Sequence, residues 1–226
     1  VLAKEITPSA KKIISEFFPG PVTVILKKNE IVPDVVTAGL DTIAIRMPSS
    51  KIARELIKQS GVPIAAPSAN LSGSTNFIHV LRDMRNKIPC VLVGPAARYG
   101  LESTVIDCTG KYPVILRPGS VTLEQIKKLD KNAVNQKRVG KVKSPGQKYK
   151  HYSPKAKVKF VKRETSNVKR ETSNVKRGKA YIGLNKKFAK GFEVVKICKT
   201  IDDYAKNLFS FFRECDEMGI KTIYCE

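Results

Sequence analysis

Small and hydroxyl-bearing residues close a short apolar run in the first third of the chain, and such residues can bind a ligand through backbone N–H groups and a hydroxyl. The run covers residues 62–66, and the stretch Ala-Ala-Pro-Ser-Ala-Asn at residues 65–70 ends it. We interpret the run as a buried strand that presents the Ser68 hydroxyl, because open α/β sheets bind ligands where their strands end. The alternative for the same residues is a simple turn.

Two arginines stand at the ends of other apolar runs, where they could clamp an anionic group. Arg46 follows the run at residues 42–45, and Arg117 ends a second run. A guanidinium at a strand end can pair with a carboxylate or a phosphate through two parallel hydrogen bonds. The alternative for Arg46 is an ion pair with Glu102 or Asp41. Arg117 could likewise form only a surface ion pair.

The elements that must position these residues alternate between strands and helices. Residues 1–129 have the pattern of an α+β or mixed-sheet α/β domain, residues 130–157 form a basic linker, and residues 158–226 form a small Rossmann-like unit. The expected strands are residues 22–26, 42–46, 62–66, 90–93, 103–107, 114–116, 158–161, 180–183, 194–197 and 222–224. The expected helices are residues 8–18, 50–59, 77–85, 122–129 and 201–217; in the second, Ile52, Ala53, Leu56 and Ile57 should face inward.

Six motifs occur in an order that resembles the threonylcarbamoyl-AMP synthase family, of the two-domain type with a YrdC-like domain. They are Phe-Pro-Gly-Pro-Val-Thr (18–23), Thr-Ile-Ala-Ile-Arg-Met-Pro (42–48), the stretch at 65–73, Gly-Leu-Glu-Ser-Thr-Val (100–105), Leu-Arg-Pro-Gly (116–119) and Ser-Pro-Gly-Gln-Lys-Tyr-Lys-His-Tyr-Ser-Pro (144–154). The resemblance covers residues 10–155 strongly and the remainder only by pattern. It implies a twisted, mixed α/β sheet of the YrdC-like type, followed by a small Rossmann-like α/β domain.

The resemblance implies an enzyme, an L-threonylcarbamoyladenylate synthase of the nucleotidyltransferase class. Its substrates would be L-threonine, bicarbonate and ATP, and its products threonylcarbamoyl-AMP and pyrophosphate. The first product would feed a downstream transferase complex that makes N6-threonylcarbamoyladenosine in tRNA. Mg²⁺ would come with ATP rather than occupy a site made by protein ligands alone. The family also implies a cytoplasmic location and no membrane partner.

The resemblance also assigns ligands to single residues. L-threonine would be bound by Arg46, Ala66 and Ser103. ATP would be bound by Thr42, Ser68, Asn76, Arg117 and Tyr149. Tyr149 would act from a segment that closes over the nucleotide as a lid. No catalytic residue is assigned, and His151 is interpreted as a packing or phosphate contact. Ser103 could instead bond to its own backbone, and the sequence around Asn76 departs from the family pattern.

Two departures from the family lead us to expect a truncated sequence with little activity as supplied. The motif Pro-Thr-Glu-Thr-Val-Tyr-Gly and a basic ATP-binding segment should precede residue 1, and a last motif should follow residue 226. The alternative is a non-catalytic YrdC-like module that binds double-stranded RNA or tRNA. A third reading is a hydrogenase-maturation carbamoyl transferase, which would carry zinc-finger and acylphosphatase segments; neither is visible in the sequence.

Charge and cysteine content bound the remaining possibilities. The net charge is +22, and residues 137–179 contribute +14 of it, with sixteen Lys or Arg against two Glu. Such a segment attracts polyanions and suggests an RNA contact; the alternative is a solvated linker. Residues 162–175 contain two copies of Lys-Arg-Glu-Thr-Ser-Asn-Val, which favours a duplication in a tolerant surface segment; the alternative is a nucleic-acid contact. Five cysteines without a Cys-x-x-Cys pair suit a reducing compartment and argue against a zinc knuckle.

Overall fold

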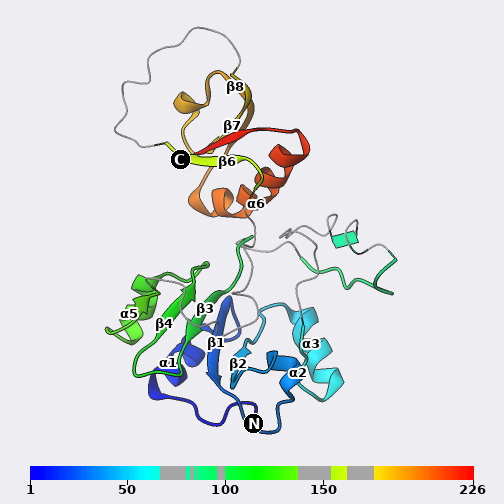
Figure 1. Ribbon diagram of the computed structural model, residues 1–226, viewed down its shortest axis with the longest axis vertical. Coiled ribbons are helices and arrows are strands. Elements are labelled where there is room, and N and C mark those ends of the chain that lie inside the picture. The colour runs from blue at the N-terminus through cyan, green and yellow to red at the C-terminus, as the bar shows by residue number, and fades with distance from the viewer. Residues whose placement is uncertain (67–79, 82–83, 85, 96–99, 137–153, 162–175) are drawn as a thin grey trace. The chain divides into compact units, whose positions relative to one another are not determined.

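The computed structural model describes residues 1–66, 80–81, 84, 86–95, 100–136, 154–161 and 176–226 (Figure 1). The chain divides into two units, one formed by residues 1–67 and 102–150 and the other by residues 68–101 and 151–226. Each unit has its own sheet and its own apolar core. The expected class, α/β with a mixed sheet and a second small Rossmann-like unit, is confirmed.

A five-stranded mixed sheet forms the centre of the first unit, with strand order β2-β1-β3-β4-β5. β1 is antiparallel to β2 and parallel to β3, and β3 is antiparallel to β4. Consequently β2 and β4 end at the same edge where β1 and β3 begin, and we call this the site edge. The strands are β1 Val22–Lys27, β2 Thr42–Ile45, β3 Thr104–Asp107, β4 Val114–Arg117 and β5 Val134–Asn135.

Helices α1 (Pro8–Phe17) and α5 (Leu123–Leu129) lie side by side on this sheet and share its core (Figure 1). Thr7 accepts a hydrogen bond from the Ala10 N–H and so caps α1. Thr122 and Gln125 form a reciprocal capping box at α5. Both helices begin where the sequence predicts. The core contains Ala10, Ile13, Val22, Val24, Leu26, Ile106, Cys108, Ile115, Val121, Ile126 and Ala133.

Three expectations for the first hundred residues are wrong. Helix α3 (Lys51–Ser60) forms as predicted, but none of its residues is buried, and Leu56 is 49% exposed. Residues 62–66 and 90–93 are not strands. A strand needs a neighbour to satisfy its backbone groups, and the described part of the chain places none beside these runs. Of the helix expected at residues 77–85, residues 80, 81 and 84 are helical and the others lie outside the described residues.

A parallel four-stranded sheet, in the order β6-β9-β7-β8, forms the centre of the second unit. Its elements are β6 Lys157–Phe160, β7 Lys176–Gly183, the short helix η2 Lys186–Ala189, β8 Phe192–Ile197, α6 Ile201–Glu217 and β9 Thr222–Cys225. Phe211 and Cys215 of α6 pack against Ala180, Ile182 and Ile223 of the sheet.

No helix in the described part of the chain is both long and apolar enough to cross a membrane. The remaining short helix, α2, spans Asp34–Thr37 of the first unit.

Candidate functional site

Three of the residues assigned to ligands meet at the site edge. Arg46 follows β2, Ser103 precedes β3, and Arg117 is the last residue of β4. The antiparallel pairing of β2 with β1 and of β4 with β3 brings these three sequence positions to one end of the sheet. The sheet topology therefore assembles, from three segments, a small polar surface that carries two guanidinium groups and one hydroxyl.

Arg46 is held from the loop that precedes β1. Its Nε donates to the Gly20 carbonyl at 3.0 Å, and the Gly20 N–H in turn donates to the Met47 carbonyl at 2.9 Å. Burial lowers the pKa of Arg46, and the neighbouring charge of Arg117 lowers this pKa further. This repulsion agrees with the placement of both arginines at the same edge of the sheet. An anion placed between two such cations would relieve this repulsion.

Arg117 is fixed on the Ser103 segment by several contacts. Its Nε and Nη2 donate to the Ser103 carbonyl at 3.2 and 2.9 Å, and Nη2 also donates to Ser103 Oγ at 3.1 Å. Its Nη1 forms an ion pair with Glu102. Among the described contacts, Glu102 pairs with Arg117 rather than with Arg46.

Ser103 carries the hydroxyl of the site and is 6% exposed. Besides the contact with Arg117, its Oγ lies 2.7 Å from Oγ1 of Thr23, a residue of β1. Sequence reasoning did not single out Thr23. Its signal is a hydroxyl residue between Val22 and Val24, which both belong to the core, so that strand alternation turns Thr23 to the opposite face.

Two glycines let the site segments approach each other closely. A Cβ on Gly119 would lie 2.5 Å from both the Glu102 carbonyl oxygen and the Thr104 nitrogen. A Cβ on Gly20 would collide with the Phe17 carbonyl oxygen. Any side chain at either glycine would therefore push against backbone atoms, which cannot rotate away. Neither glycine was assigned a role from the sequence beyond its motif.

The other assigned residues lie elsewhere. Thr42 is buried at the start of β2, opposite Lys27, and so at the other end of this strand from Arg46, about 13 Å away at 3.3 Å per residue. Ala66 is exposed beyond the end of α3, and no described contact joins it to the three site-edge residues. Ser68, Asn76, Tyr149 and His151 lie outside the described residues. Their assigned roles, like those of the site-edge residues, stay predictions.

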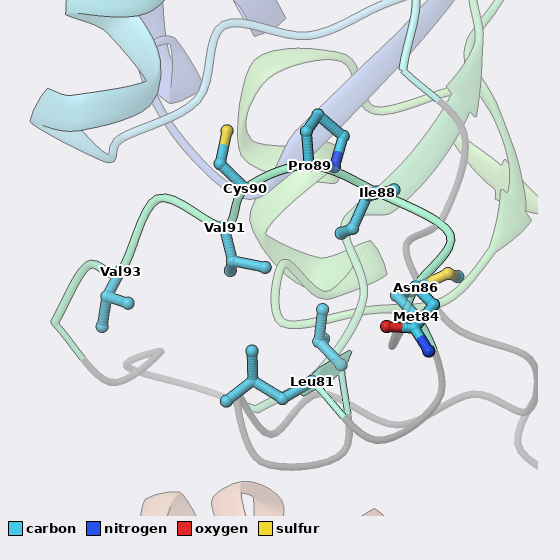
Figure 2. Close-up of a pocket in the computed structure, with 9 residues that line it drawn as sticks. Leu81, Met84, Asn86, Ile88, Pro89, Cys90, Val91 and Val93 are labelled. Carbon is cyan, nitrogen blue, oxygen red and sulfur yellow. The ribbon is translucent and has the colours of Figure 1, made fainter.

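An apolar depression of about 470 Å³ lies in a separate stretch, residues 80–93 (Figure 2). Figure 2 shows the side chains of Leu81, Ile88, Val91 and Val93 along it. Leu81 and Val93 are 45% and 58% exposed, so the depression is shallow and open. It offers apolar contact, and none of the described residues that line it is charged. We therefore take the site edge as the candidate functional site.

Metal binding by protein side chains alone has no support in the described residues. Among them, no group of three or more His, Cys, Asp or Glu side chains is arranged to hold an ion. The positive charge of the site edge comes from its two arginines.

Two family models together match nearly the whole sequence. The family described as "Telomere recombination" matches residues 1–119, and that described as "Threonylcarbamoyl-AMP synthase, C-terminal domain" matches residues 121–226. The threonylcarbamoyl-AMP synthase of Pyrococcus abyssi is 42% identical over 241 residues, which cover 100% of this chain and 70% of the relative. That of Bacillus subtilis is 36% identical over 234 residues, covering 96% of this chain and 67% of the relative.

The fold agrees with these sequence matches. The crystal structure of P. abyssi Sua5 complexed with L-threonine superposes with a TM-score of 0.83 at 39% identity. The match covers 100% of this chain and 70% of that chain. The mixed sheet of the first unit and the parallel sheet of the second thus have a solved counterpart within one protein.

Proposed function

Because the chain belongs to the threonylcarbamoyl-AMP synthase family, we propose that its first unit binds L-threonine and ATP at the site edge. The proposed reaction joins threonine, bicarbonate and ATP into threonylcarbamoyl-AMP and releases pyrophosphate. The family relationship supports an enzyme of this kind, and the solved relative that is described as complexed with L-threonine supports the amino acid.

The observation that carries the proposal is the convergence of Arg46, Ser103 and Arg117. Arg46 is engaged by protein only through its Nε, as far as the described residues show. Its two terminal nitrogens can therefore meet a carboxylate side by side. Arg117 already shares its donors between Ser103 and Glu102. We assign the threonine carboxylate to Arg46 and a phosphate-facing role to Arg117.

The proposed chemistry has two steps, and its bonds balance. The threonine amine attacks the carbon of bicarbonate, and a carbamate forms with loss of water. A carbamate oxygen then attacks the α-phosphorus of ATP, and the bond from this phosphorus to the β-phosphate oxygen breaks to release pyrophosphate. Negative charge grows on the phosphate oxygens during the second step. Fixed guanidinium groups stabilise such charge because they need no reorientation when it appears.

Magnesium enters this proposal as part of the ATP substrate. Nucleotide-bound Mg²⁺ keeps several waters and takes most of its protein ligands as carboxylates. Among the described residues at the site edge, the carboxylate is that of Glu102, which is paired with Arg117. We therefore assign no step to a metal held by the protein.

RNA contact and delivery of the product to a tRNA-modifying transferase complex also stay proposals. The basic segment that suggested RNA binding, residues 137–179, lies largely outside the described residues. A polyanion contact there would supplement the site edge rather than replace it.

Replacing Arg46 tests the proposal directly. The substitution Arg46→Ala should weaken L-threonine binding tenfold or more, because a hydrogen bond to a charged group contributes about 1.5–3 kcal/mol. Isothermal titration of the 226-residue chain with L-threonine measures this. Arg54→Ala, on the exposed surface of α3, removes an equal charge away from the site edge and should leave the affinity unchanged. Equal binding by the Arg46→Ala chain and the unaltered chain would contradict the proposal.

A further inference from the structure

We propose that Thr23 is a positioning residue for threonine recognition: its hydroxyl holds the Ser103 hydroxyl in the orientation that donates to the bound amino acid. The proposal rests on the function assigned above to the site edge. It gives a role to Thr23, a residue of the motif at 18–23 to which neither the ligand assignments nor the comparisons give one.

The contact between the two hydroxyls is short and comes from two paired strands. Thr23 lies in β1, and Ser103 directly precedes β3, with which β1 pairs in parallel. The oxygens are 2.7 Å apart, the usual separation for an O–H···O hydrogen bond. Ser103 is the partner of the Thr23 hydroxyl within the described part of the chain. The register Val22 to Thr104 and Thr23 to Val105 keeps the pair together.

The hydrogen-bonding capacity of Ser103 shows why the direction of this bond matters. A serine hydroxyl has one proton to donate and two lone pairs that accept. Arg117 Nη2 already donates to one lone pair. If Thr23 donates to the other, both lone pairs are used, and the Ser103 proton must point elsewhere. If Ser103 donates to Thr23 instead, its proton is lost to the ligand.

The ligand decides between these two arrangements. A threonine carboxylate only accepts hydrogen bonds, so it stabilises the arrangement in which Thr23 donates and Ser103 offers its proton to the ligand. Without the Thr23 hydroxyl, no donor occupies the second lone pair of Ser103 Oγ, and the Ser103 hydroxyl can rotate among more orientations. Thr23 thus reduces the ordering that Ser103 must undergo when threonine binds.

Three substitutions test the proposal in the full 226-residue chain. Thr23→Val keeps the shape and removes the hydroxyl, so the dissociation constant for L-threonine should rise about threefold to tenfold, the range set by one neutral hydrogen bond. Thr23→Ser restores the hydroxyl and should keep the affinity within about twofold of the unaltered chain. In a chain that already carries Ser103→Ala, Thr23→Val should have no further effect, because the two residues act through one contact.

Thr104→Val is the matched control for a purely structural effect. The Thr104 hydroxyl is fully buried and exchanges two hydrogen bonds with the backbone of Val121, at 2.8 and 3.1 Å. Its loss should lower the urea midpoint of unfolding more than Thr23→Val does, while leaving threonine affinity unchanged. Thr23→Val would then act mainly on threonine affinity, and Thr104→Val, on the neighbouring strand, mainly on stability.

The outcomes distinguish this proposal from the function on which it rests. If the unaltered chain does not bind L-threonine, both are overturned. If the unaltered chain binds but Thr23→Val binds equally well, only the role of Thr23 is overturned. The same holds if Thr23→Ser is as weak as Thr23→Val, if the effect persists in the Ser103→Ala chain, or if Thr104→Val weakens binding to the same extent.

Discussion

The ion pair between Glu102 and Arg117 makes the two site-edge arginines chemically different. Arg117 forms an ion pair with Glu102 and is bonded to Ser103, whereas the hydrogen bond that Arg46 makes within the described residues runs from its Nε to the Gly20 carbonyl. The guanidinium with fewer protein partners is the one better able to take a carboxylate. The acidic neighbour of Arg117 therefore favours Arg46 as the arginine that faces the amino acid in the proposed site.

Gly119 offers a sharp test of how closely the site segments must approach. Gly119→Ala should lower the free energy of unfolding by about 1–3 kcal/mol, the usual cost of overpacking, because the new methyl group would press on the backbone of Glu102 and Thr104. L-threonine affinity should fall with it, since Ser103 lies between these two residues. Gly110→Ala is the control, because nothing lies within 4 Å of its added Cβ. Urea unfolding and titration calorimetry give both readouts, and similar behaviour of the two variants would contradict the close approach.

The positions of Arg46 and Arg117 at strand ends could be predicted, because Arg46 follows one apolar run, Arg117 ends another, and both lie in motifs. Their partners could not. The pairing of Glu102 with Arg117 and the contact of Thr23 with Ser103 join residues that are 15 and 80 positions apart. Such contacts depend on strand register and on side-chain rotamers, and neither is written in local spacing.

Helix caps show what the sequence determines well at the scale of elements. Thr7, Ser50, Thr122 and Thr200 each cap the helix that the sequence places directly after them. Capping and helical periodicity depend on residues that are close in the sequence, so they can be predicted without knowing the tertiary contacts. Strand pairing is not local. The apolar runs at 62–66 and 90–93 look like strands by composition, but the described structure gives them no partner.

Two equivalent cap deletions should therefore have different effects. Thr122→Ala should lower the free energy of unfolding by about 1 kcal/mol, because α5 contributes the fully buried Ile126 to the core. Ser50→Ala removes a comparable cap from α3, which buries no residue, and should change the global value by less than half as much. Urea denaturation followed by circular dichroism measures both. Equal losses would mean that α3 is coupled to the core more tightly than its exposure indicates.

In the molecule as a whole, four of the five cysteines are buried in the cores of the two units. Cys108 is buried in the first unit, while Cys198, Cys215 and Cys225 are buried in the second. Burial raises the pKa of Cys108 and of Cys215 to about 12. Cys90, in contrast, is exposed. The thiols thus report separately on the opening of each core.

Thiol labelling with an alkylating reagent at pH 8 should accordingly modify Cys90 quickly and the four buried cysteines slowly. In concentrated urea all five should react, and peptide mass spectrometry assigns each site. Because burial raises the pKa of Cys108 in the folded chain, the stabilising contribution of its neutral thiol is fully present below the unfolded pKa of about 8.5. The free energy of unfolding should then fall as the pH rises from there toward 12. Fast labelling of Cys108 in the folded chain, or stability that increases over this pH range, would contradict the buried placement.

The hydrogen bond from Arg117 to the Ser103 hydroxyl has a thermodynamic consequence for the two ligands that we propose to bind on either side of it. A ligand that draws the guanidinium toward phosphate changes the environment of the hydroxyl, and a ligand held by the hydroxyl changes that of the guanidinium. Linkage requires the two effects to be equal: whatever factor one ligand applies to the affinity of the other, the other returns. Through the 3.1 Å hydrogen bond between Arg117 and Ser103, the affinity for each proposed substrate would then depend on whether the other is bound.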